Sequence, residues 1–354
     1  MREENQRMNP LATTEIGTTG LFVTRLGLGG AGPAGRSFSE AAESVAHATM
    51  ERAWKLGVRY FDTAPIYGQG QSETFFGEFL SSVPRDEFVI SSKAGRHSNP
   101  EVDGPPLFDF SRDRLLRSLD ESLGRLRLDY IDIVFLHLLG DSDRHYQQAL
   151  GEALPALDEL RSQGVVRAIG VGTTKETWEM LSPFAQEGAC DCFLVADRYT
   201  LIDSSALDEF LPLCQEQRIG VMLGGPYYAG ILASDLTPED YDLFLSQRPN
   251  GLEILNQAQR LKVICDRHSV PLKAAALQFG LGHPAVATTL TACQTPEEIE
   301  ENLSMISRPV PASLWSDLKA EKLIPEQAPT HPWLTDSSPG ALQRGQTEKH
   351  QTGG

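Results

Sequence analysis

The run Ile131–His137, with the sequence Ile-Asp-Ile-Val-Phe-Leu-His, is the stretch that decides the fold class. It is apolar almost throughout, whereas a strand with one face in water alternates apolar and polar residues. Strands with apolar side chains on both faces are covered on both faces, as in a parallel sheet flanked by helices. The run therefore predicts a buried parallel strand that ends in a histidine.

Short apolar runs of the same kind recur along the chain, with helical sequence between them. Together with the first run, the candidate strands are Leu26–Gly29, Tyr60–Asp62, Phe88–Lys93, Ile131–His137, Ala168–Gly172, Cys192–Val195, Gly220–Gly224 and Ala287–Leu290. Among the helices, the leucine stripe of residues 115–126 has Ser111 in place to cap its start, and Gly164 is placed to end the next helix.

Strands that alternate with helices form either an open doubly wound sheet or a closed barrel. No G-x-G-x-x-G turn follows the first strand, and polar residues stand at the carboxyl ends of several different strands. A barrel builds its site at those ends. We therefore predict an α/β fold, a (β/α)8 TIM barrel.

The two ends of the chain differ from the barrel sequence. Residues 15–23 contain Gly17 and Gly20 and predict a short hairpin ahead of the first strand. Beyond residue 324 the chain is rich in Pro, Gln, Ser, Thr and Gly without an apolar period, which predicts disorder. The expected organisation is a flexible N-terminus (1–14), a barrel domain (15–324) and a disordered tail (325–354).

Composition excludes several classes of function. The chain has 48 acidic and 31 basic residues, a net charge of −17, which repels nucleic acid and anionic lipid. No secretory signal opens the chain, and no apolar run of about 18 residues could span a membrane. The five cysteines form no CxxC pair, which predicts buried reduced thiols and no metal site. We expect a cytoplasmic protein with no nucleic-acid or membrane partner.

Four polar residues lie at or just after strand ends. Asp62 ends one strand and Tyr67 follows it by five positions, while Lys93 and His137 end the next two strands. Because the carboxyl ends of barrel strands surround one mouth, we expect these four side chains to converge there.

This combination of groups suits proton exchange with a carbonyl or alcohol oxygen. A tyrosine alone has a pKa near 10, but a nearby ammonium favours the phenolate, and an aspartate keeps that lysine charged. A histidine can donate to the substrate oxygen and position it. None of these groups supplies a hydride, so a cofactor is expected.

The stretch 57–68, which contains Asp62 and Tyr67, closely resembles the signature of the aldo-keto reductases. The segments 119–126, 129–132 and 169–172 follow in the family's order, and the resemblance extends from about residue 16 to about residue 306. It implies a (β/α)8 barrel, an NADPH or NADH cofactor, and a catalytic tetrad of Asp62, Tyr67, Lys93 and His137, with Tyr67 as general acid/base.

Further segments narrow the resemblance. Residues 198–201, 223–227 with 230–233, and 274–279 are similar to the aldose 1-dehydrogenase branch, whose members oxidise sugars to lactones and whose relatives oxidise pyridoxal. The alternatives are a general aldehyde or ketone reductase and a cofactor-sensing regulatory subunit, since the family includes channel β subunits. The substrate is expected to be an aldose or small carbonyl compound, and the oligomeric state stays open.

The segment after the last strand predicts a capped helix. Thr295 is the N-cap, Pro296 occupies the first helical position, and Glu298 completes a capping box. The resemblance implies that this helix start faces the adenosine phosphate. The residues expected to bind the cofactor are Gly30, Thr173, Tyr199, Gly225, Pro226, Gln294, Glu298 and Asn302.

The cofactor segment departs from the family's NADPH pattern. Gln294 stands where an arginine is common, among several glutamates, so NAD is expected over NADP. If NADP is used instead, the candidate phosphate ligands are Lys262, Lys273 and Arg308. Two other positions differ from the family. The Ser-Asn pair that the family usually has after the fifth strand is replaced by two threonines, at 173–174. Gly224 stands where the family often has an aromatic residue that stacks on the nicotinamide, and Tyr199 or Tyr227 could substitute for it.

Overall fold

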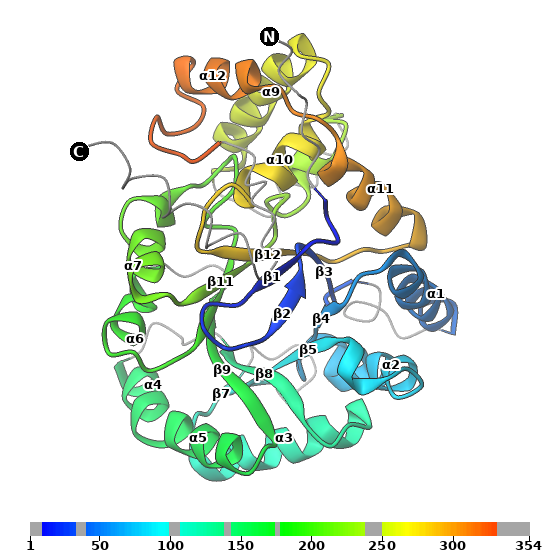
Figure 1. Ribbon diagram of the computed structural model, residues 1–354, viewed down its shortest axis with the longest axis vertical. Coiled ribbons are helices and arrows are strands. Elements are labelled where there is room, and N and C mark those ends of the chain that lie inside the picture. Colours follow the sequence, from blue (N-terminus) through cyan, green and yellow to red (C-terminus); the bar gives the residue numbers. More distant parts are fainter. Residues whose placement is uncertain are drawn as a thin grey trace, which may run out of the picture.

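The computed structural model describes residues 9–32, 40–98, 107–137, 143–173, 178–237 and 250–330. Within them, eight parallel strands close into a barrel in the order β10-β11-β12-β3-β4-β5-β8-β9 (Figure 1). These strands are β3 (Leu26–Gly29), β4 (Tyr60–Asp62), β5 (Val89–Ala94), β8 (Ile131–His137), β9 (Val166–Thr173), β10 (Cys192–Ala196), β11 (Gly220–Gly224) and β12 (Val286–Thr291). Pairing of β12 with β3 closes the sheet, which confirms the predicted barrel and excludes the open sheet.

Helices surround the barrel in a ring, as Figure 1 shows. They are α1 (Glu40–Leu56), α2 (Gln71–Leu80), α3 (Arg112–Leu126), α4 (Asp143–Gln148), α5 (Leu154–Ser162), α6 (Ser182–Gln186), α7 (Phe210–Gln217), α9 (Gly251–Arg267), α10 (Leu272–Gly280), α11 (Pro296–Ser307) and α12 (Ala312–Ala320). Gly164 follows α5 with φ +76°, as predicted. Ser111 does stand at the start of α3, but its hydroxyl caps no backbone N–H, so that predicted cap is wrong.

Two apolar layers hold this architecture together. The outer layer lies between strands and helices, where Leu115 and Leu119 of α3 are buried. The inner layer fills the barrel and includes Tyr60 and Phe135. Strand residues alternate between the two layers because successive side chains of a strand point to opposite faces.

A hairpin of β1 (Thr13–Glu15) and β2 (Phe22–Thr24) closes the amino end of the barrel, and Figure 1 shows it crossing in front of the strands. Its Ile16, Leu21 and Val23 are buried in the same cluster as the barrel interior. The hairpin is therefore a plug, and it leaves only the carboxyl end of the strands for a site. It begins two residues before the predicted Glu15.

Both ends of the chain are more ordered than predicted. Asn9–Thr14 was expected to be flexible, but the Pro10 carbonyl accepts a hydrogen bond from the Leu26 N–H. Residues 325–330, expected within the disordered tail, lie on the barrel. Gln327 Nε2 donates to Asp208 at 2.6 Å, and Ala328 is buried. These contacts offset the entropy cost of ordering a polar segment, and composition alone could not reveal them. Residues 331–354 lie outside the described part of the chain.

A polar cluster stabilises the amino end of the barrel wall. Asp132, near the start of β8, is fully buried and accepts hydrogen bonds from Arg85 and Arg167, each at 2.8 Å, and from the Ile90 N–H at 2.9 Å. Both carboxylate oxygens thus have donors. An ionised carboxylate buried without partners would be strongly unfavourable, so this set of contacts is needed for Asp132 to lie there.

Two features of the described chain were not predicted from sequence. A second antiparallel pair, β6 (Arg96–His97) with β7 (Leu107–Phe108), follows β5, and a short π-helix at Ala149–Ala153 precedes α5. None of the helices in the described ranges has the length and apolar character needed to cross a membrane.

Candidate active site

The carboxyl ends of β4, β5 and β8 bring an aspartate, a lysine and a histidine together. Asp62 ends β4, Lys93 lies near the end of β5, and His137 ends β8; these strands are neighbours in the barrel. The Lys93 ammonium donates to Asp62 Oδ2 at 2.6 Å and to the Thr63 carbonyl at 2.8 Å. All three side chains are buried, so they form a polar cluster inside the mouth of the barrel.

Tyr67 approaches this cluster from a short 3-10 turn, Tyr67–Gly70, that precedes α2. Its ring centroid lies 6.0 Å from that of His137 and 4.9 Å from the Lys93 ammonium. Gly70, at φ +93°, lets the chain reverse tightly against Arg125, which a Cβ would strike at 2.8 Å. The loop thus presents a half-buried tyrosine to the buried lysine, which is the convergence that the strand-end pattern predicts.

The loop that carries Tyr67 is anchored by an ion pair between the buried Glu73 and the partly buried Arg125 behind it. Glu73, fully buried on α2, accepts from Arg125 Nε at 2.7 Å and from the Ser92 hydroxyl at 2.6 Å. Ser92 lies on the outer face of β5, so these contacts join α2, α3 and the barrel wall. They limit where the start of α2, and therefore Tyr67, can lie.

The Lys93 ammonium stays charged although it is buried. Burial alone lowers its pKa, but the negative charge of Asp62 and, after it, the interaction with Tyr67 more than offset that effect, so the pKa is raised from its ordinary value. A lysine that stays charged next to a tyrosine favours the phenolate of that tyrosine. Asp62 and Lys93 thus place a buried positive charge beside the Tyr67 ring.

His137 is buried as the neutral imidazole. Burial lowers its pKa well below the ordinary value, and the positive charges of Lys93 and Arg96 lower it further. Within the described residues, neither of its ring nitrogens has a hydrogen-bond partner. Buried polar atoms without a partner are rare in folded proteins, so this pair points to a ligand that completes the site.

Sequence reasoning missed two residues of the same cluster. The Ser91 hydroxyl donates to Asp62 Oδ1 at 2.7 Å, and the Tyr60 hydroxyl lies 3.0 Å from Ser91 Oγ. Both were treated as ordinary strand residues. The available signal was their spacing: Tyr60 stands two positions before Asp62, and Ser91 two before Lys93, so each pair shares a face of its strand.

The residues expected to bind the cofactor lie mostly around the same mouth, because they follow the carboxyl ends of β3, β9, β11 and β12. Thr173 is buried at the end of β9. Gly30 follows β3, and a Cβ there would lie 2.3 Å from Ser72 Oγ. At Gly225, where φ is +63°, a Cβ would meet Asp197 at 2.3 Å, and Pro226 follows it. These glycines leave the rim of the mouth without side chains.

Asn302 is already hydrogen-bonded in the structure. The Tyr227 hydroxyl donates to its Oδ1, and its Nδ2 donates to Cys293 Sγ at 3.4 Å. Burial raises the pKa of Tyr227 well above its ordinary value, so the hydroxyl remains a donor. An adenine that used the Asn302 amide would therefore bind the second lone pair of Oδ1 or the second proton of Nδ2, which these two contacts leave available.

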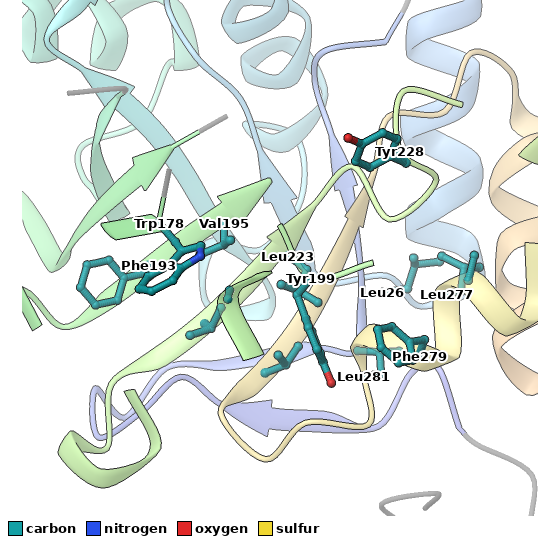
Figure 2. Packing of buried hydrophobic residues seen from close by; sticks show 14 of the residues in the cluster. Leu26, Trp178, Phe193, Val195, Tyr199, Leu223, Tyr228, Leu277, Phe279 and Leu281 are labelled. Carbon is teal, nitrogen blue, oxygen red and sulfur yellow. The ribbon is translucent and has the colours of Figure 1, made fainter. Parts of the chain in front are cut away.

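Tyr199 does not lie at the mouth, so its expected part in cofactor binding is corrected. Its ring is buried between the barrel wall and α10, 5.0 Å from Phe279 and 5.8 Å from His283 between ring centroids. Figure 2 shows it packed among Leu223, Phe279 and Leu281. A ring held in this way cannot stack on a nicotinamide. Of Tyr199 and Tyr227, only Tyr227 stays a candidate for stacking on the nicotinamide.

The start of α11 has the predicted Thr295 cap, but the return bond of the predicted capping box is displaced by one residue, because Glu298 accepts from Gln294 and not from Thr295. The Thr295 hydroxyl accepts from the Glu298 N–H, and Pro296 occupies the first turn. The Glu298 carboxylate accepts the Gln294 N–H at 2.7 Å. An acidic side chain thus lies at this helix start, and its charge opposes the binding of an anion there.

The three candidate phosphate cations lie in different places. Lys262 pairs with Asp266 on the exposed side of α9, and Arg308 donates to the Ser269 carbonyl beyond the far end of α11. Lys273 pairs with Glu301 and lies 5.9 Å from the Tyr227 ring. Lys273 is therefore the candidate that lies beside the Asn302 region.

One cluster of possible metal ligands occurs among the described residues, and it lies outside the barrel. The ligand atoms of Glu43, His47 and Glu78 are within 4.8 Å of one another, between α1 and α2. His47 already contacts Glu78 at 3.1 Å, and Arg127 pairs with the same carboxylate. These contacts explain the cluster without an ion, and the absence of a metal site stays a prediction.

Comparison with known proteins agrees with this geometry. The model of the aldo/keto reductase family matches residues 25–321. The chain is 36% identical over 324 residues to D-threo-aldose 1-dehydrogenase of a Pseudomonas species, covering 86% of this chain and 96% of that protein. It is also 36% identical over 338 residues to pyridoxal 4-dehydrogenase of Microbacterium luteolum, covering 87% and 97%.

A solved aldo-keto reductase from Bacillus halodurans has the same fold, with a TM-score of 0.69 at 24% identity over 89% of this chain and 98% of that one. The family match spans the barrel and includes all four residues of the predicted tetrad. The chain belongs to the aldo/keto reductase family and is an NAD(P)-dependent oxidoreductase.

Proposed function

We propose that this enzyme is an aldose 1-dehydrogenase that oxidises a cyclic sugar to its lactone, with NAD as the preferred cofactor and Tyr67 as general acid/base. The observation that carries the proposal is the buried Asp62–Lys93 pair beneath Tyr67, beside a neutral His137. The identity to an aldose 1-dehydrogenase over nearly the whole barrel supports the sugar as substrate.

The residues at the mouth fit a nicotinamide cofactor. The unpartnered nitrogens of His137 and the rim glycines leave polar groups and backbone open for a ligand. The residues that would hold it are Gly30, Thr173, Gly225, Pro226, Gln294, Glu298 and Asn302. When bound, the nicotinamide accepts the hydride that leaves C1 of the sugar.

Within this arrangement the side chains handle the proton. Tyr67 takes the proton of the C1 hydroxyl while the electron pair of the C1–H bond leaves as hydride, which forms the lactone carbonyl. Lys93 favours the phenolate that accepts the proton. His137, being neutral, can donate one N–H to the same substrate oxygen and hold it near Tyr67.

The start of α11 supports NAD over NADP. Glu298 occupies the Gln294 N–H, and Glu297 adds a second negative charge in the first turn. A ribose 2′-phosphate would meet these carboxylates, whereas a free 2′-hydroxyl carries no charge. Lys273 does not reverse this preference, because it is already paired with Glu301.

A second candidate substrate is pyridoxal, favoured by the equal identity to a pyridoxal 4-dehydrogenase. Pyridoxal carries an aldehyde beside a hydroxymethyl group, and the two groups close to a cyclic hemiacetal. Its oxidation to a lactone therefore needs the same proton transfer as that of a sugar.

All five cysteines are buried free thiols, which fits our proposal of a cytoplasmic enzyme.

The test is a set of initial rates with NAD and with NADP across aldoses, pyridoxal and simple aldehydes. We expect the highest kcat/KM with NAD and an aldose. A higher kcat/KM with pyridoxal would select the second candidate. Activity confined to the reduction of simple aldehydes would contradict both dehydrogenase assignments, and no turnover with any substrate, despite cofactor binding, would favour a regulatory subunit.

A further inference from the structure

A chain of hydrogen bonds runs through the barrel interior to the Asp62–Lys93 pair. The Tyr60 hydroxyl lies 3.0 Å from Ser91 Oγ, and Ser91 Oγ lies 2.7 Å from Asp62 Oδ1. The other carboxylate oxygen, Oδ2, accepts from Lys93 at 2.6 Å. The chain links two neighbouring strands, because Asp62 and Ser91 are register partners between β4 and β5.

The order of donors in this chain follows from the number of protons available. The Asp62 carboxylate, in an ion pair with Lys93, only accepts. Ser91 has one hydroxyl proton and gives it to Asp62, so its oxygen accepts from Tyr60. Tyr60 can serve as that donor because burial, and then the negative charge of Asp62, raise its pKa well above the ordinary value and keep the phenol neutral.

The surroundings of Tyr60 indicate that this chain of hydrogen bonds does more than fill space in the barrel. Tyr60 belongs to the cluster that fills the barrel, whose other members are aliphatic or aromatic side chains, with one methionine and one cysteine. A phenylalanine would pack in such a place without needing a partner. The Tyr60 hydroxyl instead lies within hydrogen-bond distance of Ser91, and through Ser91 it is linked to the carboxylate that holds Lys93.

We propose that Ser91, supported by Tyr60, is a positioning residue that holds Asp62 so that Lys93 tunes Tyr67. The inference rests on the proposed function in one respect, that Tyr67 carries the proton. Ser91 acts in two ways. It fixes the rotation of the carboxylate so that Oδ2 faces Lys93, and its proton partly neutralises the Asp62 charge that would otherwise oppose formation of the Tyr67 phenolate.

Both effects predict the same change when the hydroxyl is removed. In Ser91→Ala, Asp62 is less well held and carries more effective negative charge, so the pKa of Tyr67 should rise. A rise of about one unit lowers the phenolate fraction, and hence kcat for oxidation, about tenfold on the acidic side of the pH–rate profile. Ser91→Thr, which keeps the hydroxyl, should restore the wild-type profile, and Tyr60→Phe should give a smaller shift in the same direction.

The experiment measures the pKa of Tyr67 directly as well as through kcat. Titration of tyrosinate absorbance, taken as the difference between each protein and its Tyr67→Phe counterpart, isolates one of the eight tyrosines and needs no substrate. Thr288→Val is the control, because it removes a fully buried hydroxyl–carbonyl hydrogen bond, to Thr24, on β12, a strand that pairs with neither β4 nor β5. We expect Thr288→Val to lose stability without moving the Tyr67 titration.

The outcomes separate this inference from the proposed function. If Ser91→Ala folds, binds NAD and titrates like the wild type while Tyr67→Phe is inactive, the positioning role is wrong and the function stands. If Tyr67→Phe remains active, the general acid/base assignment fails first. If Ser91→Ala does not fold, Tyr60→Phe decides, and a wild-type titration in that variant overturns the role.

Discussion

The two ends of strand β8 carry buried polar residues in opposite states. Near its amino end, Asp132 accepts hydrogen bonds from Arg85, Arg167 and a backbone N–H, so both of its oxygens have donors. At its carboxyl end, neither nitrogen of His137 has a partner in the part of the chain that the structure describes. Only five positions of one strand separate the two residues.

The difference shows how the barrel divides stability from chemistry. A polar group with all its hydrogen bonds made stabilises the fold and leaves nothing for a ligand, whereas a polar group left without partners costs stability until a ligand binds. The Asp132 carboxylate, at the amino end that the hairpin closes, is of the first kind. The mouth is of the second kind, and variants at the two ends should therefore fail in different assays.

The largest effect is expected at the mouth. Tyr67→Phe removes the proposed proton carrier, so kcat should fall by about 10²–10⁴-fold, the usual contribution of a general acid or base. NAD affinity, measured by fluorescence titration, should stay close to normal, and so should the melting temperature. Tyr146→Phe is the control, since it loses only an exposed hydrogen bond to Glu187. Retention of more than about a tenth of wild-type kcat would remove Tyr67 from the mechanism.

The counterpart at the amino end is Asp132→Asn. It leaves Arg85 and Arg167 without their carboxylate, and the free energy of unfolding in urea should fall by about 2–4 kcal/mol. The kcat of the folded variant should be unchanged. Asp158→Asn, which breaks an exposed pair with Arg161, should cost no more than about 0.5 kcal/mol. A tenfold loss of kcat in Asp132→Asn would show that the two ends are coupled.

His283, just before β12, extends the comparison to a histidine at the amino end. Burial lowers its pKa to about 4, while its Nδ1 accepts the Ala285 N–H. Below about pH 6.5 the unfolded chain gains a proton at this histidine that the folded chain does not, so stability is complete above pH 6.5 and falls as the pH drops toward 4. The contribution of His283 to this loss is about 2–3 kcal/mol.

His283→Asn tests that contribution, because an amide oxygen can accept the same N–H without titrating. Urea unfolding between pH 7 and pH 4 should show a smaller loss of stability in the variant than in the wild type, with kcat at pH 7 unchanged. An identical pH dependence in the two proteins would mean that His283 does not cause the acid instability. The neutral His137 is then the next residue to examine, since its pKa is lowered too.

The smallest effect concerns the rim of the mouth. Gln294→Arg places a cation beside Glu298 and should improve NADP use by about 1–2 kcal/mol, or about 5–30-fold in kcat/KM. The melting temperature without cofactor should not change. Lys273→Met is the companion variant. Because Lys273 is paired with Glu301 and is not expected to bind the phosphate, kcat/KM with NADP should not change in this variant. A wild-type preference for NADP would contradict the expected role of the acidic helix start.

Much of the fold could be predicted from the sequence because its signals are local. Runs such as Ile131–His137 and Cys192–Val195 identify buried strands by themselves, and all eight predicted strands are present. One correction lies where distant segments decide: residues 325–330 are ordered by contacts with Asp208 and Gly282, which lie far away in the chain. The missing Ser111 cap is a second correction, and nothing in the structure explains it.

In the site, too, local sequence signals could be read from the sequence and contacts between distant segments could not. The convergence of Asp62, Tyr67, Lys93 and His137 could be predicted because each residue stands at or just after a strand end, where the topology of a barrel brings side chains together. Tyr199 was misplaced because it follows β10 in sequence, while its ring turns back to pack on Phe279. Ser91 was missed because a serine within a strand carries no signal of its own until the neighbouring strand supplies its partner.

What the sequence determined by itself is the set of elements and the chemistry available: a parallel barrel, and an aspartate, tyrosine, lysine and histidine at its strand ends. Only the tertiary structure decided how those groups are paired. Hydrogen bonds such as Ser91 to Asp62 join residues 29 positions apart, and their existence depends on strand register and burial. Protonation states depend on the same closure, because water is excluded from Lys93 and His137 only when the whole barrel is assembled.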